Sequence, residues 1–173
     1  MSSDPVQRGL FLGIDPGLHG AVAVLSIEDA IYPYIQEIHD VPTLPVPYRG
    51  KTRRELDPHR LVQILRPLAS RVRVAVLELP TASPQMGVVS AFRFGQAVEG
   101  VRSVLAALEI PVKTVAPSVW KSLMRLPANK VQALTKVREW LEGDYRIKLL
   151  RRHDHAEAAA LALLGFERFF DTP

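Results

Sequence analysis

Residues 9–25 read GLFLGIDPGLHGAVAVL, which is two apolar runs separated by an acid, a proline and two glycines. Apolar runs of this length between Gly and Pro signals are typical of buried strands. The sequence Asp15-Pro16-Gly17 between them is typical of a tight turn. We therefore predict two paired central strands, with Asp15 at the end of the first. Asp15 either only begins the turn, as Asp before Pro often does, or belongs to a site that other acids complete.

The composition is that of an ordinary folded domain. The chain has 173 residues, of which 47% are hydrophobic and 23% charged, so we expect one domain over residues 1–173 with residues 1–8 as a flexible N-terminus. We expect no membrane partner, because no apolar run is long enough to span a bilayer and no signal-peptide layout is present. The chain has no cysteine, which excludes disulfides, thiolate nucleophiles and Cys-ligated zinc and is compatible with a cytoplasmic location.

Positive charge is concentrated in two segments, although the net charge is only +4. Residues 113–152 hold ten Lys/Arg against three acids, and residues 49–73 hold eight against two. Clustered positive charge suits a polyanion such as nucleic acid. Charge alone is equally compatible with a plain solvated basic face.

The remaining pattern predicts alternating strands and helices. Residues 31–39 are β-prone, and Pro33 favours the edge of a sheet. Residues 40–56 contain three prolines and then a basic run, so we predict a surface loop there. Asp57-Pro58 is typical of a helix start. Further along the chain we predict a strand over 72–79, a helix over 88–108, a strand over 112–115, and helices from Pro117, over 130–141 and from His153.

Four acids occupy comparable positions in this pattern. Asp15 and Glu78 each end an apolar strand, while Asp154 and Glu157 lie three residues apart at the start of an Ala-rich helix and so share one face. All four carboxylates meet if that helix begins over the strand ends, where ligands of α/β sheets gather. Alternatively, Asp154 and Glu157 only complement the helix dipole. Glu78 is harder to dismiss, because an acid directly after VRVAVL stands where a residue is normally buried.

Four uncompensated carboxylates repel one another, and a divalent cation removes that conflict. Mg²⁺ and Mn²⁺ prefer such oxygen ligands, and two ions together can activate a water and stabilise the leaving oxygen of a phosphodiester. We therefore predict Asp15, Glu78, Asp154 and Glu157 as catalytic metal ligands, with two Mg²⁺ or Mn²⁺ ions per site. Asp15 is the acid on which the other three are centred.

The ordered set of motifs resembles the RuvC-type Holliday-junction resolvases of the RNase H-like superfamily. The motifs are GIDPG at 13–17, Glu78 after a β run, and Asp154-x-x-Glu157 in an Ala-rich helix. The segments FGQA at 94–97, PSVWK at 117–121 and Asn129-Lys130 also look like their counterparts there. The resemblance runs from about residue 10 to residue 165.

The resemblance implies an α/β fold with a mixed five-stranded RNase H-like sheet flanked by helices. It also implies a homodimer that nicks four-way DNA junctions with a divalent metal, leaving 5′-phosphate and 3′-hydroxyl ends. Lys121 and Lys130 match two basic residues near the family's active site, although both can also be ordinary exposed lysines. The last acid is often Asp in bacterial members, so Glu157 favours a phage member, acting in a bacterial or phage-infected cell.

One departure concerns the aromatic wedge that bacterial members carry shortly after the strand-end acid. Leu79-Pro80-Thr81 stands there instead. Met86 and Phe92 are candidates for an apolar wedge, and equally for core or interface positions. The helix 88–108 is our candidate for the dimer surface.

Three other functions compete with that of a junction resolvase. An actin-like ATPase or sugar kinase needs two lobes, for which 173 residues are too few. An RNA-processing nuclease of the short RuvC-like type and a non-catalytic junction-binding protein stay as alternatives. His19, His153 and His155 also stay open, since each either assists the site or has a structural role.

Overall fold

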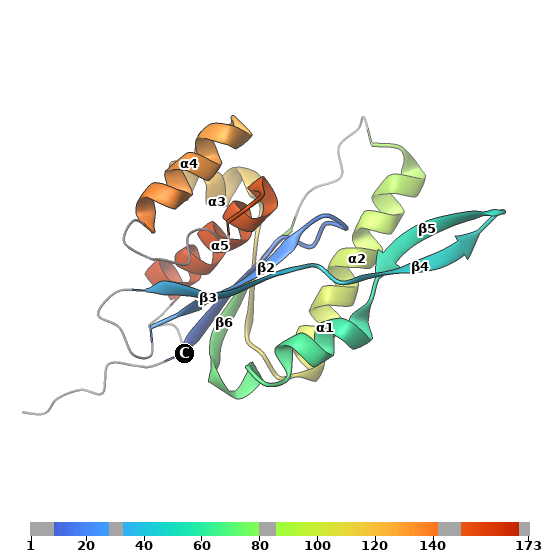
Figure 1. Ribbon diagram of the computed structural model, residues 1–173, viewed down its shortest axis with the longest axis horizontal. Helices are drawn as coiled ribbons and strands as arrows, with labels where there is room; N and C mark the ends of the chain where they lie inside the picture. Colours follow the sequence, from blue (N-terminus) through green and yellow to red (C-terminus); the bar gives the residue numbers. More distant parts are fainter. Residues whose placement is uncertain (1–8, 28–32, 80–85, 142–149, 170–173) are drawn as a thin grey trace, which may run out of the picture.

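The computed structural model describes residues 9–27, 33–79, 86–141 and 150–169, which form a five-stranded sheet between two layers of helices (Figure 1). The strand order in this sheet is β3-β2-β1-β6-β7. The strands are β1 (Leu10–Ile14), β2 (Ala21–Ser26), β3 (Tyr34–Asp40), β6 (Val72–Glu78) and β7 (Val112–Val115).

The sheet is mixed, as predicted. Strand β2 runs antiparallel to β1 and β3, whereas β1, β6 and β7 are mutually parallel neighbours. The carboxyl ends of β1, β3, β6 and β7 therefore lie at one edge, which we call the carboxyl edge. The position of β3 at the side of the sheet confirms the expectation from Pro33, and β6-α2-β7 is a parallel crossover unit.

The two helical layers bury opposite faces of the strands. Helices α1 (Pro58–Leu65) and α2 (Val88–Ala107) cover one face, and α3 (Pro117–Leu123), α4 (Lys130–Trp140) and α5 (His153–Phe169) cover the other. Alternation along β1 explains the division: Leu10, Leu12 and Ile14 join the core below α1 and α2, while Phe11 joins the core below α5. No helix in the described part of the chain is both long and apolar enough to cross a membrane.

Two of the predicted helix starts are capped as expected. Asp57 Oδ1 accepts a hydrogen bond from the backbone N–H of Arg60 at 2.9 Å, and Pro58 begins α1. Asn129 Oδ1 accepts from the N–H groups of Val131 and Gln132 at 3.0 and 3.1 Å and so fixes the start of α4. The position of Lys130 as the first residue of α4 follows from this cap.

The prediction of a surface loop over residues 40–56 is wrong, because most of this segment forms a separate hairpin of β4 (Thr43–Tyr48) and β5 (Lys51–Leu56). Arg49 and Gly50 both have positive φ, at 48° and 75°, which suits the two-residue turn of a tight hairpin. Pro45 and Pro47 are two residues apart, so their missing N–H groups lie on one side of β4. That side needs no partner because, among the described strands, β4 pairs only with β5. The predicted flexible N-terminus, residues 1–8, lies outside the described residues.

Candidate metal centre

Helix α5 packs unusually close to β1, and this contact places its first turn at the carboxyl edge. A Cβ on Gly13 would lie 1.9 Å from the carbonyl oxygen of Ala158 and 2.3 Å from the backbone nitrogen of Ala162. The alanines of this helix that face the sheet are buried, so no large side chain holds the two backbones apart. The sequence motif with Gly13 and the Ala-rich helix therefore form one packing unit.

Asp15 follows β1 directly and is held by its own turn. Its Oδ1 accepts a hydrogen bond from the N–H of Gly17 at 3.0 Å, and its N–H donates to the carbonyl of Ala21 at 3.0 Å. A Cβ on Gly20 would lie 2.1 Å from the carbonyl oxygen of Asp15, so only glycine allows the chain to pass there. The turn fixes the carboxylate at the centre of the carboxyl edge.

Asp15 carries the electrostatic signature of a crowded acidic site. Burial raises the pKa of Asp15 above its ordinary value, and the charges of Glu157 and Asp154 raise it further. The N–H of Gly17 and the charge of Lys121 act in the opposite direction. Acids that lie more than 130 residues away in the sequence thus act on Asp15, as the strand-end and helix-start pattern predicts.

Glu78, the last residue of β6, is buried and hydrogen-bonded inside the protein. The indole Nε1 of Trp120 donates to its Oε2 at 2.7 Å, and Trp120 itself is fully buried. Burial raises the pKa of Glu78 to about 7, and the charges of Asp15 and Glu157 add to the rise, against the opposing effects of Trp120 and Lys121. Trp120 was not predicted as a site residue, because a tryptophan in a helix is most simply interpreted as core.

The first turn of α5 gathers three potential ligand groups. One atom from each of His153, Asp154 and Glu157 lies within 4.8 Å of the others. His153 Nε2 lies 3.3 Å from Glu157 Oε1, and its Nδ1 lies 3.9 Å from Asp154 Oδ1. Burial lowers the pKa of His153, so the imidazole is neutral at neutral pH, which is the form that binds metal ions.

The two predicted lysines occupy different positions. Lys121, in the last turn of α3, forms an ion pair with Glu157 and lies 5.3 Å from the centroid of the Trp120 ring. Lys130 is exposed at the start of α4, and its charge helps to lower the pKa of His153. Lys121 is therefore placed within the acidic cluster, and Lys130 beside it.

A divalent cation suits this donor set. Carboxylates that raise one another's pKa are poorly compensated, and Lys121 supplies one positive charge among four acids. Carboxylate oxygens are the ligands that suit Mg²⁺ or Mn²⁺, and a bound ion would favour the charged form of each acid. His153 places a neutral ring nitrogen beside these oxygens.

A group of ion pairs that we call the Asp40 clasp holds the start of α5 against the sheet. Asp40 Oδ1 lies 2.6 Å from Arg152 Nη2 and accepts from His155 Nε2 at 2.8 Å. Arg152 Nη2 also donates to the carbonyl of His19 at 3.2 Å. The clasp therefore joins α5, the end of β3 and the Asp15 turn, through the imidazole of His155 and the backbone carbonyl of His19.

The candidate wedge residue Phe92 is not a core residue. Its side chain is 66% exposed on the first turns of α2, as are those of Val88 and Val89 at 85% and 60%. The wedge and interface interpretations of Phe92 therefore both stay open.

No protein-family model matches the sequence, and no curated protein sequence matches it either. Solved structures do match: T. thermophilus RuvC in complex with a Holliday junction substrate, at TM-score 0.65, and the Thermus thermophilus RuvC structure, at TM-score 0.62. Each is 20% identical in sequence, and the match covers 94% of this chain and 97% of the RuvC chain. The chain therefore has the fold of RuvC, which is the RNase H-like fold that its motifs predict.

Proposed function

We propose that this chain is a metal-dependent endonuclease that resolves four-way DNA junctions. The observation that carries the proposal is the convergence of four acids from β1, β6 and α5 at the carboxyl edge, with the pKa values of Asp15 and Glu78 raised. The similar fold of a RuvC solved with a Holliday junction substrate supports the same choice of substrate.

Asp15, Glu78, Asp154 and Glu157 would hold two Mg²⁺ or Mn²⁺ ions, with His153 as a further donor. Bound ions supply the activation of a water and stabilise negative charge on the leaving 3′ oxygen, so that the products carry 5′-phosphate and 3′-hydroxyl ends. The chain's own contribution is to keep the acids on rigid elements. Trp120 fixes the orientation of the Glu78 carboxylate. The close packing at Gly13 fixes the position of α5 relative to Asp15.

Lys121 and Lys130 would contact the phosphate at the site. Lys121 neutralises Glu157 in the metal-free protein, and its ammonium would be available to a phosphate oxygen when Glu157 serves as a metal ligand. His153, neutral at neutral pH, can accept a proton at its Nδ1 or Nε2 when it is not used as a ligand. Basic residues between 113 and 152 would hold the arms of the junction.

A homodimer would place one site on each strand of a two-fold symmetric junction. The exposed apolar side chains of Val88, Val89 and Phe92 on α2 support this helix as the subunit contact. We further propose that residues 1–173 act as one nuclease domain in the cytoplasm of a bacterial or phage-infected cell.

The test is cleavage of labelled substrates over a titration with Mg²⁺. The proposal expects paired, symmetric nicks in a four-way junction and little cleavage of a linear duplex or a structured RNA of similar length. Preferred cleavage of the RNA would instead support an RNA-processing nuclease. Tight junction binding without cleavage in Mg²⁺ or Mn²⁺ would support a non-catalytic binding protein.

Asp15→Asn should reduce the rate of junction cleavage by at least about 100-fold, because it removes the central carboxylate and keeps its shape. Asp57→Asn is the matched control: it makes the same change at the cap of α1, where Asn is as good a cap as Asp, and should leave the rate unchanged. Equal rates for the Asp15→Asn variant and the parent would refute the assignment of the site.

A further inference from the structure

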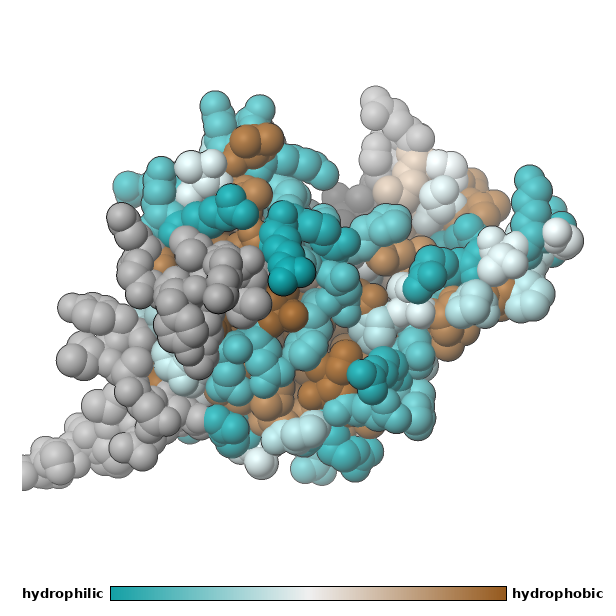
Figure 2. All heavy atoms as spheres, in the orientation of Figure 1, coloured by the Kyte–Doolittle hydropathy of each residue, from teal (hydrophilic) through white to brown (hydrophobic). Residues whose placement is uncertain are grey.

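A cluster of arginines surrounds one tyrosine at the projecting hairpin. The guanidinium carbons of Arg53, Arg49 and Arg93 lie 4.3, 5.3 and 5.5 Å from the ring centroid of Tyr48. Arg93 comes from α2, so the ring joins that helix to β4 and β5. We call these four residues the Tyr48 cluster. The hairpin projects from the molecule beside α2 (Figure 1), and hydrophilic side chains gather at its far end (Figure 2).

The charge of the cluster is poorly compensated within the hairpin. Residues 43–56 contain Arg49, Lys51, Arg53 and Arg54 against the single acid Glu55, which forms an ion pair with Arg53. Each cation–π contact at an exposed site stabilises the fold only weakly, while like charges around one ring repel. The Tyr48 cluster therefore adds little to the stability of the fold. Its charge suits a partner that carries negative charge.

Guanidinium groups gathered around one aromatic ring suit phosphate in particular. A cation–π contact leaves N–H groups of each guanidinium for other partners, and Arg53 directs one of its own to Glu55. Two N–H groups of one guanidinium match two oxygens of a phosphate group at once. The ring of Tyr48 therefore restrains the three arginine side chains before binding. This reduces the conformational entropy that they lose when a partner binds.

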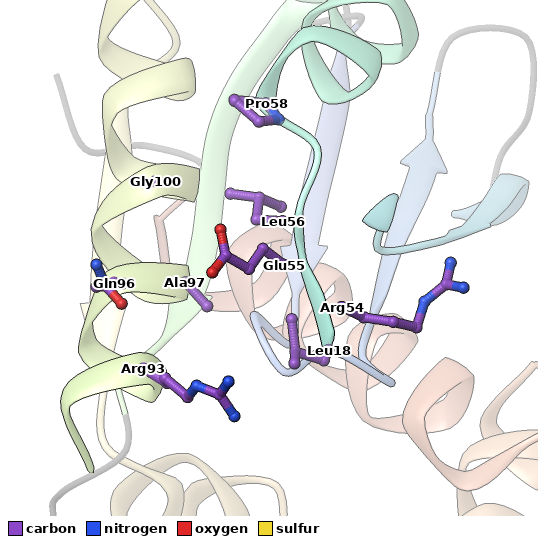
Figure 3. A pocket seen from close by; sticks show the side chains of 9 residues that line it. All are labelled: Leu18, Arg54, Glu55, Leu56, Pro58, Arg93, Gln96, Ala97 and Gly100. Carbon is purple, nitrogen blue, oxygen red and sulfur yellow. The ribbon is translucent and has the colours of Figure 1, made fainter. Parts of the chain in front are cut away.

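The cluster lies next to the turn that carries Asp15. A cavity of about 210 Å³ separates the base of the hairpin from α2, and its lining includes Leu18 from the Asp15 turn together with Leu56, Arg93 and Gln96 (Figure 3). A Cβ on Gly100 would lie 2.6 Å from Leu56 Cδ2, so α2 and β5 are closely packed below the cluster. A nucleic-acid backbone bound at the candidate metal centre would reach the hairpin if it continued across Leu18.

We propose that the Tyr48 cluster docks the phosphate backbone of a duplex DNA arm outside the point of cleavage. This inference rests on the proposed function and adds where one arm of the junction lies. The contact is with phosphate groups, so it adds affinity without sequence preference and weakens with salt.

The test measures binding in EDTA, where cleavage is not supported, by fluorescence anisotropy at several salt concentrations. The double variant Arg49→Gln/Arg93→Gln removes two phosphate contacts and should reduce the slope of log affinity against log salt by about two units. Cleavage of the saturated complex in Mg²⁺ should stay within about twofold of the parent, because neither arginine belongs to the metal centre.

Arg102→Gln is the control for the loss of one positive charge from α2, and its effect is compared with the loss per arginine in the double variant. Arg102 lies nine residues after Arg93 on α2, which places it on the opposite side of the helix, and its guanidinium is 3.7 Å from Glu99. It should leave the salt slope unchanged. Tyr48→Phe keeps the ring and should keep the parent slope, whereas Tyr48→Ala should lower both slope and affinity.

Both a four-way junction and a linear duplex are used as probes, so that two failures can be told apart. A parent protein without preference for the junction contradicts the proposed function, while the loss of slope on the duplex still supports the docked arm. A double variant with the parent slope on both probes overturns the docking proposal. An equal loss of slope per charge for Arg102→Gln also overturns it. A loss of dimer in sedimentation with the salt slope unchanged does the same.

Discussion

Two regions flank the Asp15 turn and differ in nearly every physical property. On the α5 side, acids are largely buried, backbones touch at Gly13, and the pKa values of Asp15 and Glu78 are raised. On the hairpin side, arginines are gathered around the partly exposed Tyr48, and within the described residues β4 and β5 pair only with each other. Chemistry on a phosphodiester needs carboxylates at fixed positions, whereas contact with a long polyanion needs accessible charge. The α5 side therefore holds acidic groups at fixed positions, whereas the hairpin side presents accessible basic groups.

The strongest test of this difference is the same substitution made on each side of the sheet. Gly13→Ala should lower the free energy of unfolding by about 3 kcal/mol or more, because the new methyl group would overlap the backbone of α5. Gly95→Ala on α2 should raise it by about 0.5–1 kcal/mol, because in the described part of the chain no atom outside the helix's own backbone lies within 4 Å of the added Cβ, and Ala favours helix. Urea denaturation measures both, and equal effects would show that the packing at Gly13 is not tight.

Trp120→Phe tests the buried support of Glu78. It removes the donor to the carboxylate and leaves a cavity, so the free energy of unfolding should fall by about 2 kcal/mol. The hydrogen bond lowers the pKa of Glu78, so its loss raises that pKa further and the destabilisation should be larger at pH 8 than at pH 5. An equal loss at both pH values would indicate a cavity effect alone. Trp140→Phe, at a partly exposed position, is the control and should change little.

Asp40→Asn tests the clasp, with a smaller expected effect. The ion pairs of Asp40 are largely exposed, so the free energy of unfolding should fall by less than about 1 kcal/mol. The rate of junction cleavage should fall about tenfold with DNA affinity unchanged, because a displacement of Asp154 and Glu157 costs rate rather than binding. Glu37→Gln changes another acid of β3, one paired with His39, and should leave the rate unchanged. Unchanged kinetics in Asp40→Asn would exclude a positioning role.

Sequence patterns predicted the sheet and the strand-end acids because these depend on local features. Apolar runs, the Asp15 turn and the caps at Asp57 and Asn129 act within a few residues, and all appear in the structure as expected. The hairpin at 43–56 was missed because its two prolines argue against strands. Its turn at Arg49-Gly50, followed by a β-compatible run, was the available signal.

The supports of the site were missed because they join residues distant in the sequence. Trp120 lies 42 positions after Glu78, and His155 lies 115 positions after Asp40. Asp40 ends a strand at the same edge as Asp15 and Glu78, but the loop predicted from residue 40 hid this position. That it pairs with Arg152 and His155, rather than joining the acids, depends on where α5 begins.

Glu78 is the residue most important to the candidate metal centre. Its pKa is about 7, against an ordinary value of 4.5, and this rise predicts the direction in which stability changes with pH. The raised pKa of Glu78 makes a contribution that lowers the stability of the metal-free protein as pH rises from about 4.5 to 7, and Glu78→Gln should remove this contribution while keeping an acceptor for Trp120. A divalent cation should restore the stability of the parent, because it favours the charged carboxylate.

The decisive measurement is thermal unfolding of the parent and of Glu78→Gln at pH 7.5, with chelator and with Mn²⁺. We expect the variant to be the more stable of the two in chelator and to gain much less from Mn²⁺ than the parent. A parent that is more stable in chelator, together with an equal gain from Mn²⁺ in both proteins, would contradict the assignment of Glu78 to a divalent-metal site.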